Sequence, residues 1–469
     1  MRASMIQTAG QWSACMMAGV ELGDKRRVQR AIQVLERIAM SPSASIPTQM
    51  DSPGDAKAAY RLFAAPEVTF DAICAEQWRL TRAAASQAST VLMIQDTTKL
   101  NFGFNSRTKG LGPIGCEPCG KGLHLHTTLA VVPGEQVLGV AHQDLWRRRP
   151  APKGETRSAR RDRPKESDCW QEAIIATGTP PPGSRWIHVG DREADIYGVF
   201  ERCRTTGCDC VVRVNGSAAN RRSVAGHEES WPDGSVKQLK QVTRTRPDMG
   251  RYQLDLRGRD GLKARSITLV VSAGPVTILS PRTDLISERS HQRLWAVRAC
   301  ELRADGQRKP GGIEWTILTT VAVTDEKSAL GVIEWYSQRW LIEEYHKCLK
   351  SGCSVEKRQL QESQRLEPLI GLLCMTAARL LALKLDARRT PDARAMQVAS
   401  PEHVRMMARK RGLDPRIMTC REFWRHTARM GGFMGRKGDG DPGWQTLWRG
   451  WQTLDAMVAG ALLEREGAT

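Results

Sequence analysis

Three acidic residues, far apart in the chain, stand where carboxylates could do chemistry together. Asp96 and Asp191 each end a short apolar run, residues 91–96 and 186–191, that predicts a buried β-strand, and Glu343 lies in a predicted helix over residues 334–350. Carboxylates from two strands and a helix can hold two Mg²⁺ ions about 4 Å apart, which suits an in-line displacement at phosphorus. Oxygen ligands favour Mg²⁺, or Mn²⁺ in its place, over zinc. The pattern predicts a site that cuts phosphodiester bonds.

Each of these carboxylates also has a simpler interpretation. Strand-end aspartates commonly start turns or cap helices, so Asp96 and Asp191 are open to both explanations. Glu343 follows Arg339 by four residues, and exposed Glu–Arg pairs of this kind are frequent on helices. Helical spacing predicts a polar stripe beside a core stripe, the first made of Tyr336, Arg339, Glu343 and Lys350 and the second of Trp335, Ile342 and Leu349.

The charge balance predicts a polyanionic partner. The chain has 469 residues, with 70 Lys and Arg against 51 Asp and Glu, for a formal net charge of +19. Because cations that neutralise phosphates release counterions, nucleic acid is the first candidate. With 41% hydrophobic and 26% charged residues the chain has an ordinary folded composition, long enough for about three domains.

A basic segment concentrates part of this charge. Residues 145–165 carry nine cations against Glu155 and Asp162, and three prolines argue against a regular helix there. The segment is expected to be a basic loop that is either simply solvated or follows a phosphate backbone. Its cations are Arg147, Arg148, Arg149, Lys153, Arg157, Arg160, Arg161, Arg163 and Lys165.

The cysteines and apolar segments indicate a cytoplasmic protein with no membrane span. The 13 cysteines are an odd number and mostly stand singly in apolar segments, as expected for reduced thiols. No secretory signal is visible at the N-terminus. The longest apolar stretch, residues 369–383, is interrupted by Arg379 and is short for a membrane span, so we expect a buried helix.

One cysteine pair raises the alternative of a zinc site. Cys116 and Cys119 form a CxxC, followed by His124 and His126. The alternation of the two histidines is typical of a strand, which sets both imidazoles on one sheet face without the usual zinc-ligand spacing. Packing or loop thiols are therefore the favoured interpretation.

The remaining pattern predicts an α/β protein with a mixed sheet. Residues 1–75 read as helical, including a helix capped by Asp24 and a second one over residues 55–63. Residues 76–385 hold the predicted strands and a helix over residues 166–178, with a polar β insertion at about 218–312. Residues 386–469 are basic and helical and end in an amphipathic segment, which either packs on its own domain or self-associates.

Three sequence blocks resemble one family, the bacterial insertion-sequence DDE transposases with a Tyr-Arg-Glu-Lys signature. The signature is matched by Tyr336-Ser-Gln-Arg339-Trp-Leu-Ile-Glu343 followed by Lys350, the second-aspartate block by Val189-Gly-Asp191-Arg-Glu-Ala-Asp195, and the first by Ile94-Gln-Asp96-Thr-Thr98. The resemblance is strongest to the Tn-five type of cut-and-paste transposase and runs over nearly the whole chain. It implies a ribonuclease-H-like core with a β-strand insertion, flanked by helical N- and C-terminal domains.

The resemblance also implies residue roles. Asp96, Asp191 and Glu343 would bind the metal ions, Mg²⁺ with Mn²⁺ as a substitute. Tyr336, Arg339 and Lys350 would grip phosphates near the cleaved end. Trp315 would stack on a flipped base, with Arg213 beside it, although a core tryptophan in a strand is the alternative from sequence alone.

The family's DNA contacts and reaction follow in the same way. The terminal inverted repeats would be bound by Arg26, Arg27 and Arg30, then by Lys57, Tyr60 and Arg61, and DNA held by a partner subunit by Lys357 and Arg358. The implied enzyme works as a homodimer on double-stranded DNA: it nicks each element end, forms and reopens a hairpin, and joins the 3′-hydroxyls to target DNA. The alternatives are a non-catalytic inhibitor that occupies the ends and a ribonuclease-H-like nuclease without strand transfer.

Overall fold

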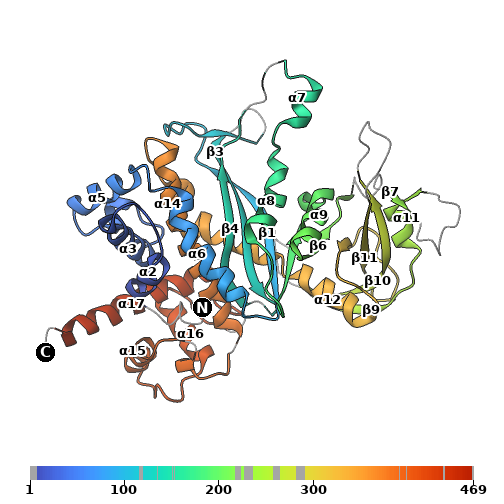
Figure 1. Cartoon of the computed structure of the whole chain (residues 1–469). Coiled ribbons are helices and arrows are strands. Elements are labelled where there is room, and N and C mark those ends of the chain that lie inside the picture. Colours follow the sequence, from blue (N-terminus) through green and yellow to red (C-terminus); the bar gives the residue numbers. More distant parts are fainter. Residues whose placement is uncertain are drawn as a thin grey trace. The chain divides into compact units, whose positions relative to one another are not determined.

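The chain divides into two compact units, each described here by itself. The computed structural model describes residues 8–466 except 116–119, 135, 150–151, 153, 217–222, 226–235, 257–264, 281–290, 390, 398 and 437–438. Unit 1 comprises residues 1–87, 97–156 and 341–469, and unit 2 comprises residues 88–96 and 157–340. Element labels are those of Figure 1.

Unit 1 begins with short helices packed through their apolar faces. Asp24 caps the second of them as predicted, accepting a hydrogen bond from the Arg26 N–H at 2.7 Å. The helix predicted over residues 55–63 begins two residues earlier, because Ser52 caps it and Pro53 suits the first helical position. The helices are α2 (Ala9–Met17), α3 (Lys25–Met40), α4 (Ile46–Gln49), α5 (Pro53–Phe63) and α6 (Phe70–Ala85).

A small antiparallel sheet and a long helix form the core of unit 1. Strand β3 (Gly120–Val132) pairs with β2 (Gly112–Ile114) and with β4 (Gln136–Trp146). Helices α6 and α14 (Ser363–Arg389) pack on β4. Residues 363–385 of α14 are long and apolar enough to cross a membrane, but 89% of the most apolar window is buried inside the protein, as in the core helix predicted from the sequence.

The C-terminal part of unit 1 is helical, with α15 (Pro401–Arg411), α16 (Cys420–Met430) and α17 (Trp444–Glu466). Helices α16 and α17 meet at backbone distance, because a Cβ on Gly450 would lie 1.6 Å from the Thr427 carbonyl oxygen. The described apolar residues of the predicted amphipathic stripe are buried within this unit: Leu447, Trp448, Trp451, Leu454 and Val458. The stripe therefore packs on its own domain.

Unit 2 is built on a mixed sheet, as predicted. Strand β1 (Thr90–Asn101), which supplies residues to both units, pairs in parallel with β5 (Arg185–Gly190), and β5 in parallel with β6 (Asp209–Arg213). From β6 onward the pairing is antiparallel, in the order β12 (Glu314–Thr319), β11 (His291–Glu301), β10 (Arg265–Leu279), β7 (Ser223–Ala225) and β8 (Val236–Gln238), with β9 (Gly250–Leu256) on β10. The strands inserted between β6 and β12 in the sequence thus extend the sheet beyond β12.

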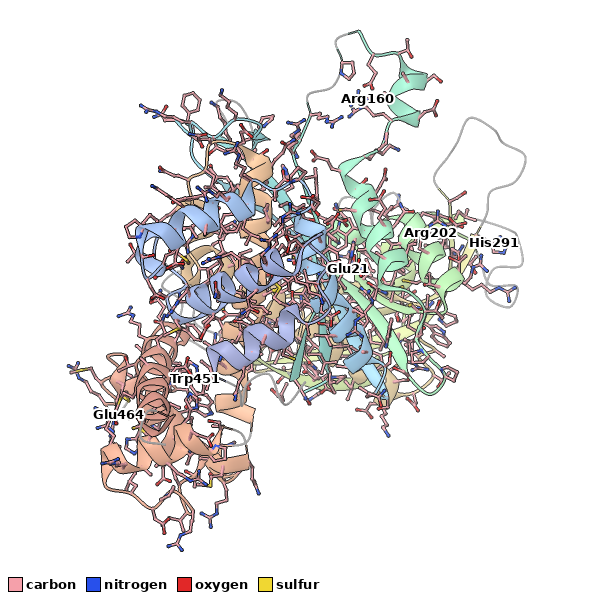
Figure 2. The ribbon with its side chains drawn as sticks, turned by 60° about the vertical axis from the view of Figure 1, so that its left-hand side comes forward. Glu21, Arg160, Arg202, His291, Trp451 and Glu464 are labelled. Carbon is pink, nitrogen blue, oxygen red and sulfur yellow. The ribbon has the colours of Figure 1, made fainter. Side chains whose placement is uncertain are left out.

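The helices of unit 2 include one that the sequence analysis missed. The basic segment was expected to be a loop, but α7 (Arg157–Asp162) is helical because the prolines at 150, 152 and 164 all lie outside it. Its described side chains, including Arg160 in Figure 2, are exposed. The other helices of the unit are α8 (Cys169–Thr177), α9 (Tyr197–Thr206), α11 (Leu239–Arg244) and α12 (Glu326–Ser337).

A buried carboxylate fastens the end of strand β11. Glu301 is 3% exposed and accepts hydrogen bonds from Arg265 Nη1 and Lys309 Nζ, both at 2.8 Å, and from the Ile313 N–H at 3.0 Å. The hydrogen bond from Arg265 is the main cause that lowers the pKa of Glu301 to about 2. Glu301 therefore stays ionised and holds the turn between β11 and β12.

Candidate active site

Asp96 and Asp191 lie at the same edge of the unit 2 sheet. The parallel pairing of β1 and β5 runs in register from Thr90 opposite Arg185 to Ile94 opposite Val189. Asp191 directly follows the end of β5, and the same register continued by two residues brings it opposite Asp96. Since side chains alternate across a sheet, the two carboxylates share one face, and both residues are half-buried. Two oxygen-rich ligands therefore come from neighbouring strand ends.

The Asp191 carboxylate is oriented by the turn that follows it. Its Oδ1 accepts a hydrogen bond from the Glu193 N–H at 2.7 Å, at the start of a 3₁₀ turn over Arg192–Ala194. Asp195, which ends this turn, accepts a hydrogen bond from the Asn215 N–H at 3.0 Å. The turn-capping role considered for Asp191 is thus real, and it fixes the direction of the side chain without removing it from the sheet edge.

A buried polar pair lies on the opposite face of the same two strands. Gln95 Nε2 and His188 Nδ1 are 2.7 Å apart, and both residues are 2% exposed. Burial lowers the pKa of His188 to about 3, so its imidazole is neutral at physiological pH. This link ties β1 to β5 one residue before Asp96.

Glu343 lies in a short helix of unit 1. The continuous helix predicted over residues 334–350 is wrong: α12 ends at Ser337, α13 (Trp340–Lys347) follows, and a π-helical turn spans Cys348–Gly352. The side chain of Glu343 is exposed in the first turn of α13, whereas Ile342 and Leu349 are buried as predicted. No group of three or more His, Cys, Asp or Glu within the described residues is placed to hold a metal ion.

Four residues predicted to act at the DNA end belong to unit 2. Trp315 on β12 is half-buried and makes a T-shaped contact with the Tyr336 ring, with ring centroids 4.9 Å apart and an interplanar angle of 71°. Arg213 ends β6, opposite Ile317 on β12, and its Nη2 donates to the Glu314 carbonyl oxygen at 3.5 Å. Arg339 follows α12 in the same unit. Trp315 lies in a strand, as its core interpretation requires, but its side chain is only half-buried and part of the ring contacts solvent.

Lys350 is placed in unit 1. Its Nζ donates to the Lys99 carbonyl oxygen at 2.7 Å and lies 3.6 Å from Glu356 Oε1. These two contacts fix the orientation of the Lys350 side chain.

The predicted end-binding residues lie on α3 and α5, where Arg27 and Arg30 are half-buried and the others are exposed, and several are paired with acids. Arg26 has a 93% exposed side chain. Arg27 pairs with Glu67 and Arg30 with Asp55, each at 2.8 Å. The side chains of Lys57, Tyr60 and Arg61 are exposed on α5. Ion pairs at such exposed positions are weak, so phosphates can replace the acids as partners.

Lys357 and Arg358 are neighbours with different surroundings. Lys357 is exposed, whereas Arg358 is 6% exposed. The Arg358 guanidinium donates to the carbonyl oxygens of Pro42 and Ala44, and to that of Cys353 at 2.9 Å. Arg358 therefore ties the N-terminal helices to the segment after α13, a structural role in place of the predicted DNA contact. Sequence alone offers no signal for this, because its three acceptors are backbone groups.

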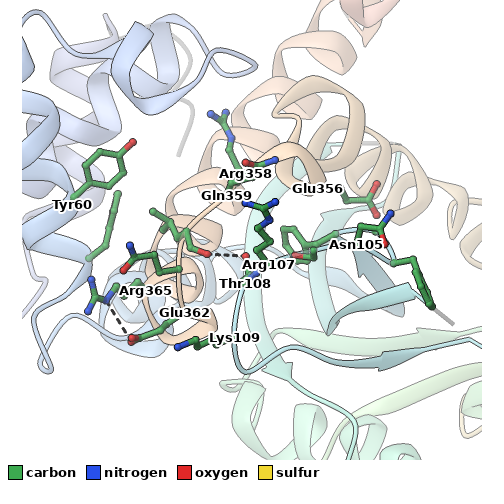
Figure 3. A pocket seen from close by; sticks show the side chains of 17 residues that line it. Tyr60, Asn105, Arg107, Thr108, Lys109, Glu356, Arg358, Gln359, Glu362 and Arg365 are labelled. Atoms are coloured by element: carbon green, nitrogen blue, oxygen red, sulfur yellow. Dashed lines mark hydrogen bonds and ion pairs between the residues drawn. The ribbon is translucent and has the colours of Figure 1, made fainter.

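A large pocket in unit 1 was not predicted. It has a volume of about 1240 Å³ and lies between α5, the loop after β1 and the segment before α14 (Figure 3). Its lining includes Tyr60, Phe104, Arg107, Lys109 and Arg365. The only signal in the sequence is that two aromatic residues, Phe102 and Phe104, are closely followed by two basic ones, Arg107 and Lys109.

The alternative of a zinc site gains no support from the described residues. Cys116 and Cys119 lie outside them. His124 is buried and stacks on Trp146 at 5.5 Å, and His126 bonds Thr97 Oγ1 through Nδ1 at 2.8 Å. Burial lowers the pKa of His126 to about 3. The cysteines that the structure describes are free thiols, and all but Cys15 are buried, as expected for small apolar residues.

Three known families match separate parts of the chain. Residues 9–68 match Transposase DNA-binding, residues 185–378 match Transposase DDE domain, and residues 375–468 match Transposase Tn5 dimerisation domain. The chain belongs to the DDE transposases related to Tn5. It is a cut-and-paste transposase that binds DNA, cleaves it and transfers strands, and its DNA-binding and dimerisation domains make DNA and a second copy its partners. The DDE domain also implies dependence on a divalent metal ion.

Several of the predicted site residues lie within the matched ranges. Asp191 and Glu343 lie within the DDE match, and helix α3, which carries Arg26, Arg27 and Arg30, lies within the DNA-binding match. Asp96 precedes the DDE match, so its assignment depends on the pairing of β1 with β5.

Proposed function

We propose that Asp96, Asp191 and Glu343 are the metal-binding triad of this transposase, with Mg²⁺ as its ion and Mn²⁺ as a substitute. The observation that supports the proposal is the parallel register of β1 and β5, which pairs Ile94 with Val189, two residues before Asp96 and Asp191. Their oxygen donors suit a hard divalent ion. When bound, such ions supply Lewis-acid activation of the attacking oxygen and stabilise the leaving oxygen.

The protein's own residues position the DNA end for this displacement. Tyr336, Arg339 and Lys350 hold phosphates near the scissile bond, and Trp315 stacks on a base turned out of the duplex, with Arg213 beside it. Contact with Tyr336 limits the rotation of the Trp315 ring, so the Trp315 ring is preorganised for stacking in the absence of DNA. Because one site serves successive nucleophiles, it can nick an end, close a hairpin, reopen it and join the 3′-hydroxyl to target DNA.

The terminal inverted repeats are bound by the N-terminal helices. Arg26, Arg27 and Arg30 supply one basic face, and α5 supplies Lys57, Tyr60 and Arg61 on another. Lys357 contacts DNA held by the partner subunit, and Arg358 supports it from within. The proposed domains are residues 1–75 for end binding, 76–385 for catalysis with the β insertion at about 218–312, and 386–469 for dimerisation in the DNA complex. We place the enzyme in the cytoplasm, on the nucleoid.

The test uses purified full-length protein and DNA that carries the inverted repeats flanking its gene. With Mg²⁺, wild type is expected to form hairpin ends and to join precut ends to a plasmid. Asp191→Ala is expected to lose both reactions while it still binds the ends. Wild-type cleavage by this variant would refute the triad, and cleavage without joining would favour a plain nuclease. Binding without cleavage by wild type would favour the inhibitor.

A further inference from the structure

The pocket of unit 1 is formed by three segments that bring together aromatic and basic side chains. Helix α5 contributes Tyr60 and Phe63, the loop after β1 contributes residues 102–109, and the chain before α14 contributes residues 356–365. The walls are joined by the Thr108 hydroxyl, which donates to the Leu360 carbonyl oxygen at 2.7 Å (Figure 3). A backbone hydrogen bond from the Lys109 N–H to the Gln361 carbonyl oxygen, at 2.8 Å, adds a second link.

The lining carries more cations than anions. Its charged residues are Arg107, Lys109, Arg358 and Arg365 against Glu356 and Glu362. Arg365 lies 3.5 Å from Glu362, and Glu356 faces Lys350. Within the part of the chain that the structure describes, the exposed side chains of Arg107 and Lys109 make no hydrogen bond or ion pair. These two cations are available to an anionic ligand.

Exposed aromatic rings stand beside these cations. Phe104 is 64% exposed and Tyr60 is 36% exposed, both among the most exposed large apolar side chains described. Aromatic faces next to a basic groove bind single-stranded nucleic acid, because every base offers a face to stack on and every phosphate a charge to pair. A duplex hides its base faces in the stack, so only unpaired nucleotides can use such rings.

We propose that this pocket binds an unpaired stretch of DNA, with bases against Phe104 and Tyr60 and phosphates at Arg107 and Lys109. Its volume of about 1240 Å³ exceeds the roughly 300–1,000 Å³ of pockets for small ligands, so it holds more than one nucleotide. The pocket residues belong to unit 1, whereas Trp315 belongs to unit 2. The inference rests on the transposase function but not on the metal triad.

The test measures binding of a fluorescein-labelled eight-nucleotide oligo-dT and of blunt terminal-repeat duplex to the full-length protein. We expect Phe104→Ala to weaken oligo-dT binding about 5- to 150-fold, the range that loss of one stacked base implies. Arg107→Gln, which removes a phosphate contact, is expected to weaken it several-fold, and both variants should leave duplex binding within about twofold. Ile175→Ala and Arg202→Gln, at exposed positions on α8 and α9, are the matched controls and should change neither affinity.

A second measurement separates stacking from folding. The fluorescence of 2-aminopurine in the oligonucleotide should be quenched by wild type and by Phe104→Trp, but not by Phe104→Ala. Equal losses for oligonucleotide and duplex, or unchanged binding of oligo-dT by both pocket variants, would overturn the proposal. Asp191→Asn should bind oligo-dT like wild type, so a failure of the triad leaves this result intact.

Discussion

Trp315 and Phe104 are both aromatic residues beside arginines, and their surroundings differ. Trp315 lies in a strand between β6 and β11 in T-shaped contact with the Tyr336 ring, whereas Phe104 lies on a loop and is 64% exposed. Groups carried on sheets are positioned more tightly than groups on loops. For the two proposed roles, this difference predicts that Trp315 holds one base in one place and that the unit 1 pocket adapts to the nucleotides that enter it.

The largest expected effect concerns the most rigid part of unit 2. Asp191→Asn keeps an oxygen that can accept the Glu193 N–H but loses the charge that a divalent ion needs. We expect cleavage of terminal-repeat DNA to fall about 10³-fold or more, with end binding unchanged. Asp195→Asn, in the same turn, is the control and should cost less than about tenfold. If Asp191→Asn cleaves DNA as well as Asp195→Asn, Asp191 has no role in catalysis and only stabilises the turn.

The next effect tests whether Trp315 acts through its ring. Trp315→Ala is expected to slow hairpin formation by about 10- to 100-fold, since one base–aromatic stack is lost. Trp315→Phe should recover most of that rate, and nicking should change less than hairpin formation in both variants. Gel assays of nicked and hairpin products measure the two steps. Equal slowing of nicking and hairpin formation would assign Trp315 to general DNA binding.

A smaller effect distinguishes the structural role of Arg358 from the DNA-binding role proposed for Lys357. Arg358→Met leaves the carbonyl groups of Pro42, Ala44 and Cys353 without their donor, which should lower the free energy of unfolding by about 1–3 kcal/mol. Lys357→Ala should leave the melting temperature unchanged and weaken DNA binding a few-fold instead. Thermal denaturation and anisotropy measure the two outcomes. A stable Arg358→Met protein with weak DNA binding would restore the predicted contact.

The smallest expected effect is on how the stability of the β11–β12 region, which includes Trp315, depends on pH. The pKa of Glu301 is lowered to about 2, mainly by the hydrogen bond from Arg265, so its contribution to stability is complete above the usual glutamate pKa of 4.5. That contribution is lost as the pH falls from about 4.5 toward 2. Glu301→Gln should therefore flatten the fall in melting temperature over this range. An unchanged profile would show that other carboxylates dominate.

Much of unit 2 could be predicted from the sequence, because its strands are short apolar runs that end in polar residues. The same pattern located Asp96 and Asp191, although their pairing depends on register, which no single run specifies. The break between α12 and α13 could not be predicted, since residues 337–339 contain neither proline nor glycine. The prolines at 150, 152 and 164 disfavour a helix over residues 145–165 as a whole, but the short helix α7 fits between them and so could not be predicted from their number alone.

The pocket and the role of Arg358 depend on contacts between residues about 250 to 320 positions apart, such as Thr108 with Leu360 and Arg358 with Pro42. Such long-range contacts cannot be predicted from the residue types near each position in the sequence. Arg107 and Arg358 are both arginines in polar surroundings of the sequence, yet one is exposed and the other is buried. Only the folded chain distinguishes them.

Helix α7 buries none of its described side chains, and this has a consequence for how the protein can change over time. Substitutions at the exposed positions 158, 159, 160 and 162 remove no core contact, so they carry little penalty in folding. Lineages can therefore tune the charge of this arm, and with it attraction to DNA in general, while the sheet that holds the acidic pair stays as it is.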